Sequence, residues 1–328
     1  MSSAPSYVPF DMLRTIHPTR SVEPHTDCAL GVRSRHALHD DRGMSDKPAT
    51  VRDLIGAYLA EQCTVLIDSE AQLRAGEDVV HTTRVAVRRL RSTIRVFADL
   101  FDRAEADDLE SELIWWATLL GEVRDLDILT ERQAALLAAL PPELMLGPVS
   151  STIQTELATR RKRATDDLID ALNSERYRKL IGLIHHWRSD PPFTAAADSP
   201  TEAIETAIKT AKKKASKRLS TAVAVRRAEE PSEELFHRAR KASKRYRYAV
   251  EAAAPVWGPK ADKIVAQRKD LQDLLGNHQD GIVSAVFLRE LGAQVGIRSG
   301  QNGFSYGILY AREAASGDRL LDELKPFL

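Results

Sequence analysis

A histidine followed by a row of basic residues occurs twice in this sequence, and the repeat limits the folds open to the chain. The first copy spans residues 81–91 (HTTRVAVRRLR) and the second spans residues 237–247 (HRARKASKRYR). In both copies a cation stands three, seven, eight and ten positions after the histidine. Since a helix turns by about 100° per residue, one face of the first copy collects most of the basic side chains. Those side chains are His81, Arg84, Arg88, Arg91 and Arg95.

Apolar residues occupy a second face of both predicted helices. In the first copy this face lies roughly 120° from the basic one, and it holds Val87, Leu90, Ile94, Phe97 and Phe101. In the second copy the matching positions hold Tyr246, Val250, Ala253 and Trp257. We therefore expect each helix to bury its apolar side while the basic side stays accessible to a ligand.

The remaining sequence has a helical period almost everywhere after Val51. Apolar residues recur at intervals of four, as in Leu54, Tyr58 and Leu66, and strand-like alternation is scarce. A second repeat pairs residues 119–125 (LLGEVRD) with residues 274–280 (LLGNHQD). Two repeats with similar offsets indicate an internal duplication. The sequence predicts an all-α protein of two antiparallel four-helix bundles, related by an approximate two-fold axis.

Breaks in the pattern suggest the domain boundaries. Residues 1–48 show no periodicity, and we interpret them as a disordered tail in which either Met1 or Met44 is the start. Residues 49–190 form the first predicted bundle, residues 191–200 with Pro191 and Pro192 form a linker, and residues 201–328 form the second bundle. Each half is long enough to bury a core of its own.

Charge is balanced overall but unevenly distributed. The chain has 47 basic and 47 acidic residues among 328, yet residues 81–95 include no carboxylate. Like charges one helical turn apart repel each other, so an anionic ligand would relieve the basic face. Three further cations share one line of a later helix, and we expect them to face the same groove: Lys209, Lys213 and Lys217.

Guanidinium groups bind phosphate oxygens in pairs, which makes an extended phosphate chain the favoured partner. Aromatic residues that could stack on bases are few near the basic faces, so RNA or DNA is a less favoured partner. The two cysteines, Cys28 and Cys63, are too few for a cysteine zinc site, and we predict neither a metal nor a cofactor. The chain lacks a membrane span and a signal sequence, so a cytoplasmic location is expected, without a membrane partner.

The two basic motifs resemble the signatures of the CHAD family, a helical domain named for its conserved histidines. The second motif extends through Tyr248 and Glu251 in the same way, and residues 119–127 resemble the family's R-D-x-D loop. The resemblance covers the chain from about Val51 to Leu328. It implies two four-helix bundles that bind inorganic polyphosphate in a basic cleft without catalysis, and an association with polyphosphate granules.

The resemblance and the helical pattern together give the predicted polyphosphate-binding residues. They are His81, Arg84, Arg88, Arg89, Arg91, Arg95, Lys209, Lys213, Lys217, His237, Arg240, Lys241, Lys244, Arg245 and Arg247. Protonation of the two histidines near pH ~6 is expected to strengthen binding. The halves differ where Lys244 replaces Arg88 and where Gln279 replaces Arg124.

Two other functions remain open at the level of sequence. A metal-dependent phosphohydrolase or polyphosphate-processing enzyme would need carboxylates beside the basic groove. Asp125 and Asp127 are the only suggestive pair, and we expect this pair to form a loop-organising salt bridge with Arg124 instead. The other alternative is an RNA- or DNA-binding protein. The sequence leaves the oligomeric state and the preferred phosphate chain length open.

Overall fold

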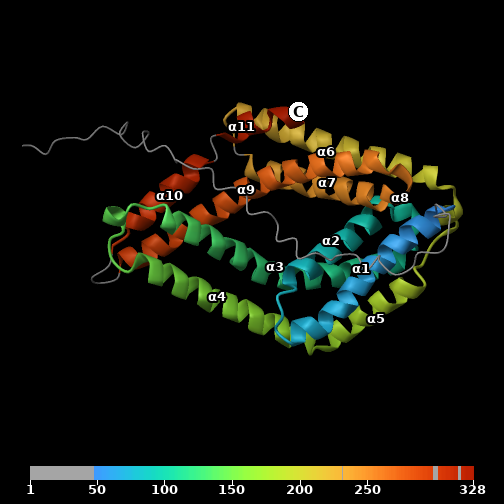
Figure 1. The fold of residues 1–328 in the computed structure, drawn as a ribbon, viewed down its shortest axis with the longest axis horizontal. Coiled ribbons are helices and arrows are strands. Elements are labelled where there is room, and N and C mark those ends of the chain that lie inside the picture. Colours follow the sequence, from blue (N-terminus) through green and yellow to red (C-terminus); the bar gives the residue numbers. More distant parts are fainter. Residues whose placement is uncertain (1–47, 231, 298–301, 317–318) are drawn as a thin grey trace, which may run out of the picture. The chain divides into compact units, whose positions relative to one another are not determined.

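The described part of the chain is helical. The computed structural model describes residues 48–230, 232–297, 302–316 and 319–328 (Figure 1). Its helices are α1 (Val51–Arg74), α2 (Val80–Val96), α3 (Arg103–Ala138), α4 (Val149–Leu172), α5 (Glu175–Ser189), α6 (Ile204–Arg227), α7 (Glu233–Ala252), α8 (Ala254–Trp257), α9 (Pro259–Gly296), α10 (Phe304–Ser316) and α11 (Leu320–Glu323). Among the described residues there are two isolated β-bridges, and no β-strand is formed. The predicted all-α class is confirmed, whereas residues 1–47 of the predicted tail lie outside the described residues.

Local sequence explains where several helices begin. Thr50 and Asp53 form a capping box at the start of α1, in which each side chain accepts a hydrogen bond from the other residue's backbone N–H. The carboxylate of Asp102 accepts bonds from two N–H groups of the first turn of α3. Gly258 has a positive φ of 52° and lets the chain turn from α8 into α9.

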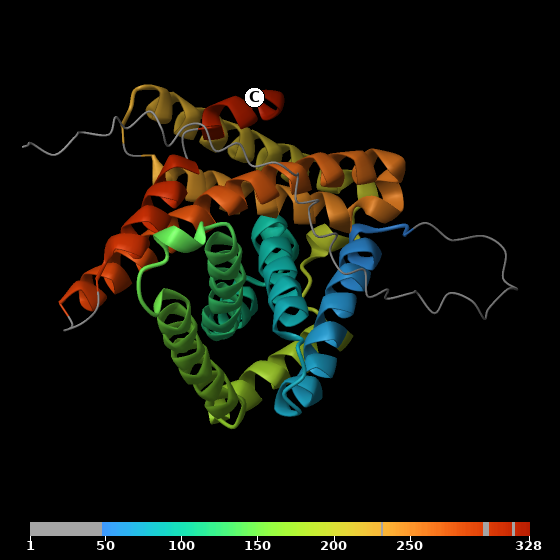
Figure 2. The ribbon, with the colours of Figure 1, turned by 60° about the vertical axis from the view of Figure 1, so that its left-hand side comes forward.

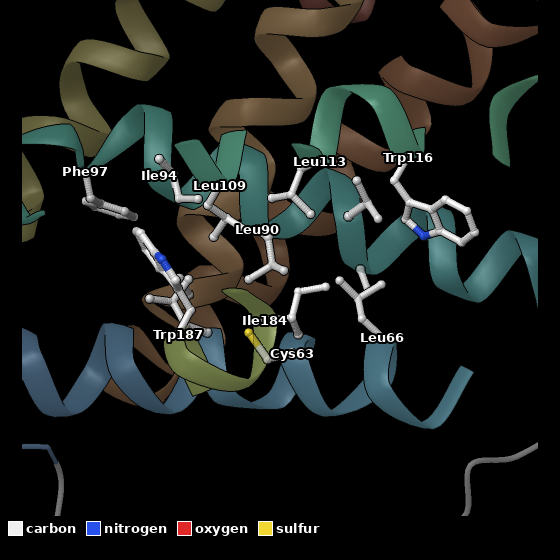
Figure 3. Packing of buried hydrophobic residues seen from close by; sticks show 14 of the residues in the cluster. Cys63, Leu66, Leu90, Ile94, Phe97, Leu109, Leu113, Trp116, Ile184 and Trp187 are labelled. Carbon is white, nitrogen blue, oxygen red and sulfur yellow. The ribbon is translucent and has the colours of Figure 1, made fainter. Parts of the chain in front are cut away.

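The largest core cluster joins α1, α2, α5 and the first half of α3. The predicted apolar row from Val87 to Phe101 is buried here, with Val87, Leu90 and Ile94 on α2 and Phe97 and Phe101 just after its end. Figure 3 shows part of this cluster, where Leu90, Leu113 and Trp187 come together from three helices. Tyr246, Val250 and Ala253 of the second half lie in the same cluster, and Trp257 packs on it. The predicted core rows of both motifs are therefore confirmed.

Two smaller clusters also draw on the long helix α9. One contains residues of α3, α4, α9 and α10, including Leu157, Leu288 and Leu309. The other contains residues of α6, α7, α9 and α11. Apolar packing thus crosses the predicted boundary, which corrects the expectation that each half buries a core of its own. The reason is helix length, since α3 with 36 residues and α9 with 38 are each more than twice as long as α2 with 17. Figure 2 shows α9, in orange, running past α2.

The predicted linker is packed against the first half. Phe193 pairs with Phe101 in a β-bridge, and their rings stack with centroids 5.2 Å apart. Pro200 forms the other bridge, with Thr50. The division at residues 191–200 and the internal duplication stay predictions. The duplication agrees with the close lengths of α3 and α9, since both carry one copy of the second repeat.

Residues 119–127 and 274–280 lie within α3 and α9. The prediction of a loop at these places is therefore wrong. The leucines, Glu122, Arg124 and Gln279 in these segments favour a helix, and a helix interior tolerates a single glycine at a cost of about 1 kcal/mol. The glycines of both segments lie beside basic side chains of the other helices, as described below.

Candidate functional site

The basic faces of α2 and α7 meet around a cavity of about 370 Å³. The two helices pack directly on each other. The lining residues are Arg84, Arg88, Arg91, Ser92, Arg95, His237, Arg240, Lys241, Lys244, Arg245 and Tyr248. We call this space the basic cavity. All of its lining residues belong to α2 or α7, and every charged lining group is a cation.

Crowding of like charges lowers the proton affinity of the central side chains. Burial lowers the pKa of Lys244 well below its ordinary value, and the neighbouring Arg240 and Arg88 lower it further. Burial also lowers the pKa of Arg88, with Arg84 and Arg240 adding to the effect against the opposing influence of Tyr248. These cations therefore repel one another across the contact between α2 and α7.

Several donors in the basic cavity have no partner in the described structure. The Nε atoms of Arg88, Arg91 and Arg240 are buried without a hydrogen-bond acceptor, and so is the hydroxyl of Tyr248. A buried donor without an acceptor costs about 1–3 kcal/mol.

Carboxylates of α3 neutralise part of the edge of the cavity. Arg84 Nη1 donates a hydrogen bond of 2.6 Å to Asp125 Oδ1 and a longer one of 3.3 Å to the carbonyl oxygen of Gly121. Glu110 forms an ion pair with Arg95 and lies 3.9 Å from Arg91 Nε. The expected salt bridge between Asp125 and Arg124 is not the one observed, because Arg124 instead lies 3.7 Å from Glu131. Sequence spacing within α2 did not reveal these partners, because they belong to another helix.

The structure does not bring Arg89 and Arg247 into the lining of the basic cavity. Glu251 holds both, accepting from Arg89 Nε at 3.0 Å and from Arg247 Nη1 at 2.7 Å. The guanidinium of Arg247 also lies over the ring of Tyr248, with its carbon 4.6 Å from the ring centroid. Arg89 therefore fastens α2 to α7, whereas Arg247 pairs with Glu251 within α7 and donates from Nε to Gln272 Oε1 of α9 at 3.0 Å. Arg89 follows Arg88 by one position, so its side chain points about 100° away.

The predicted lysine row of α6 does not converge on the basic cavity either. Lys209, Lys213 and Lys217 are exposed and do not line it, and Lys209 pairs with Glu205 at 2.7 Å. Another face of α6 turns toward α2 and α7. Its Lys214 lines a neighbouring pocket of about 590 Å³, which shares Arg95 and Arg245 with the basic cavity.

The predicted binding residues did not include Lys214, Arg218, Ser92 or Tyr248. Arg218 lies close enough to contribute to the lowered pKa of Arg245, after the larger effects of burial and of Arg95. The sequence does indicate that Lys214 and Arg218 face inward. They follow Ala207 and Ala211 at intervals of three or four residues, and these alanines pack on the core. Ser92 and Tyr248 carry no charge, so a search for cations passes over them.

The two histidines have different positions. His237 lines the basic cavity, and burial lowers its pKa from the ordinary value, with Lys241 adding to the shift. His81 stands in the first turn of α2, exposed and outside the lining. The predicted pair is therefore not equivalent in the structure.

The described residues contain no group of three or more His, Cys, Asp and Glu side chains placed to hold a metal ion. None of the helices seen there combines the length and the apolar character that crossing a membrane requires.

Comparison with known proteins supports one family. Two relatives from strains of Mycobacterium tuberculosis, MT2285 and Rv2226, are each 30% identical over 282 residues, which is 86% of this chain and 53% of theirs. The chain thus spans about half the length of the curated relatives it matches. The fold is similar to PptA from Streptomyces chartreusis, with a TM-score of 0.71, 20% identity, and 85% of this chain and 99% of that chain covered.

A second solved structure is the CHAD domain from the plant Ricinus communis. It has a TM-score of 0.64 and 25% identity, and the match covers 88% of this chain and 96% of that one. The sequence model of the CHAD domain matches residues 57–289, which include α2, α7 and the whole basic cavity. The chain belongs to the CHAD domain family.

Proposed function

We propose that this protein binds inorganic polyphosphate in the basic cavity without chemically changing it. The observation that carries the proposal is the cavity between α2 and α7, whose charged lining groups are all cations. A chain of phosphates would neutralise several of these cations at once, because guanidinium groups bind phosphate oxygens in pairs. The implied role of the CHAD family in polyphosphate binding, and its association with polyphosphate granules, agree with this ligand.

The character of the lining favours phosphate over nucleic acid. Tyr248 is its one aromatic residue, and this ring is buried between Arg89 and Arg247. Single-stranded nucleic acids usually gain about 1–3 kcal/mol for each base stacked on an exposed ring. The described cavity offers cations and no such platform, so we expect a polyanion without bases to bind better.

The direct test is a titration of the protein with long-chain polyphosphate at several salt concentrations. Affinity should fall steeply with salt, because each phosphate neutralised by a cation releases a bound counterion. Single-stranded DNA or RNA of equal charge should compete poorly at the same salt. Equal displacement by nucleic acid would contradict selectivity for polyphosphate, and the absence of polyphosphate binding would contradict the proposal as a whole.

The non-catalytic part of the proposal needs a separate measurement. Incubation of the protein with long-chain polyphosphate and Mg²⁺ or Mn²⁺ is expected to release no phosphate and to leave the chain length unchanged. Phosphate release that increases with protein concentration would support a polyphosphate-processing enzyme instead, provided that substitution of the cations lining the basic cavity abolishes it.

A further inference from the structure

The guanidinium of Arg240 lies directly against the backbone of α9 at Gly276. A Cβ atom added to Gly276 would come 2.8 Å from Nη2 and 3.5 Å from Cζ of Arg240. A separation of 2.8 Å between a carbon and a nitrogen in van der Waals contact is too short for a relaxed structure. Arg240 can therefore hold its present position in the basic cavity only while residue 276 has no side chain.

Arg84, the equivalent side chain of the first motif, lies against α3 in a similar way. Its guanidinium is 3.5 Å from the position of a Cβ on Gly121, and it also donates to the carbonyl oxygen of Gly121 and to Asp125. Gly276 likewise has a carboxylate four residues later, Asp280, whose pKa is raised by burial and lowered in turn by Arg240. Each motif arginine thus rests on a glycine of a long helix, one turn before an aspartate.

We infer that Gly276 is a positioning residue: it holds the guanidinium of Arg240 in place for binding polyphosphate. Gly121 does the same for Arg84, with a smaller effect. Glycine lets the helix backbone approach the arginine, so that the guanidinium is held with its remaining donors toward the cavity. The space at Gly276 is the tighter of the two, since a Cβ at Gly121 would meet Arg84 only at an ordinary contact distance. The inference rests on the proposed function, because it assigns the residue that orients one of its cations.

A structural role alone would not explain a glycine at this place. Glycine is among the least favourable residues in a helix interior, and Gly276 lies near the middle of α9. The three heavy atoms nearest to a Cβ added at Gly276 all belong to the guanidinium of Arg240. Alanine should therefore leave the helix intact, or make it slightly more stable, while it displaces the guanidinium.

The test compares Gly276→Ala with wild type in polyphosphate titrations and in thermal unfolding. We expect an unchanged or higher unfolding temperature together with an affinity loss of about tenfold to a hundredfold, as for one lost charge-assisted contact. The slope of affinity against salt should fall by about one counterion. Gly121→Ala should give a smaller loss than Gly276→Ala.

Gly182 supplies the matched control. It lies within α5, and a Cβ there would meet nothing within 4 Å. Gly182→Ala adds the same methyl group to a helix interior away from the cavity, and it should leave polyphosphate affinity unchanged.

A double-mutant cycle shows whether Gly276 acts through Arg240. In a background of Arg240→Ala, the change Gly276→Ala should cause no further loss of affinity. An equal loss in that background would overturn the inference, as would wild-type affinity in Gly276→Ala alone. If Arg240→Ala weakens binding while Gly276→Ala does not, only the positioning role fails. If the wild-type protein does not bind polyphosphate, the proposed function fails as well.

Discussion

Lys244 shows most clearly how the crowded cations of the basic cavity destabilise the ligand-free fold. It is surrounded by Arg84, Arg88 and Arg240, and burial together with these charges lowers its pKa. A lysine whose pKa is lower in the folded state than in the unfolded state destabilises the fold while it is charged. That penalty is present in full below the folded-state pKa and disappears as the pH rises toward the unfolded value. Free protein at neutral pH should therefore carry the penalty, and a bound polyanion should remove it.

Replacing the charge tests this reasoning. Lys244→Met should raise the free energy of unfolding of the ligand-free protein by roughly 1 kcal/mol, because the repulsion is lost and the apolar stem is retained. The same change should weaken polyphosphate binding. Urea unfolding with and without polyphosphate measures both effects. Lys241→Met, at an exposed position of the same lining, serves as the control and should leave stability nearly unchanged. A loss of stability in Lys244→Met would contradict the account.

His237 is the group expected to make binding depend on pH. Its pKa is lowered in the free protein by burial and then by Lys241, while Glu234 opposes the shift. A polyanion should raise this pKa, so binding takes up a proton and affinity should increase by about threefold to tenfold from pH 8 to pH 5.5. Titrations at fixed salt measure the profile.

Two variants separate this effect from other titrations, including that of Asp280. His237→Gln should flatten the profile, whereas His185→Gln, at an exposed position on α5, should preserve it. A flat profile in the wild-type protein would show that His237 does not take part in binding.

At the scale of single helices, sequence periodicity predicted the two faces of α2 and α7 well. It located the buried side from Val87 to Phe101 and the cations of the cavity from Arg84 to Arg95. It did not predict the carboxylates that restrain those cations, because Glu110 and Asp125 belong to the next α-helix, α3. It also misjudged which face of α6 turns inward, although Ala207 and Ala211 mark the line that packs on the core. Lys209, Lys213 and Lys217 were misplaced for that reason.

The α3 carboxylates provide a prediction at this scale. Glu110 pairs with Arg95 and lies near Arg91, so Glu110→Gln should leave both arginines free to meet phosphate. Polyphosphate affinity at low salt should then rise about threefold to tenfold, while stability falls by about 1 kcal/mol. Calorimetric titration and thermal unfolding measure the two changes. Glu105→Gln, on the same helix but beside His186, should leave affinity unchanged, and a decrease in affinity for Glu110→Gln would contradict the prediction.

At the scale of the whole described chain, the helices of the two predicted halves share their cores. The length and spacing of the repeats predicted an all-α fold, but they did not reveal how the far ends of α3 and α9 are covered. Leu288 of α9 is fully buried in a cluster with residues of α3 and α4. Packing of this kind should make the two halves unfold together.

The prediction is one cooperative transition rather than two. Circular dichroism reports all helices, while Trp115, Trp116 and Trp187 report mainly the first half. The two signals should therefore change at the same urea concentration. Leu288→Ala should lower the free energy of unfolding by about 2–5 kcal/mol and keep the transitions coincident. Separate transitions, with the tryptophan signal unaffected by Leu288→Ala, would show that the halves are independent.

The central claim is that the cations between α2 and α7 bind the phosphate chain. Its most direct test is the polyphosphate affinity of a variant with Arg84, Arg88, Arg240 and Lys244 all changed to Ala. A control variant changes four exposed cations outside the cavity lining to Ala: Arg103, Lys162, Arg178 and Arg227. Both variants lose the same net charge, so only their positions differ. The account predicts an affinity loss of at least about a hundredfold for the first variant, with unchanged helicity, and a far smaller loss for the second. Equal losses, or wild-type affinity in the first variant, would contradict it.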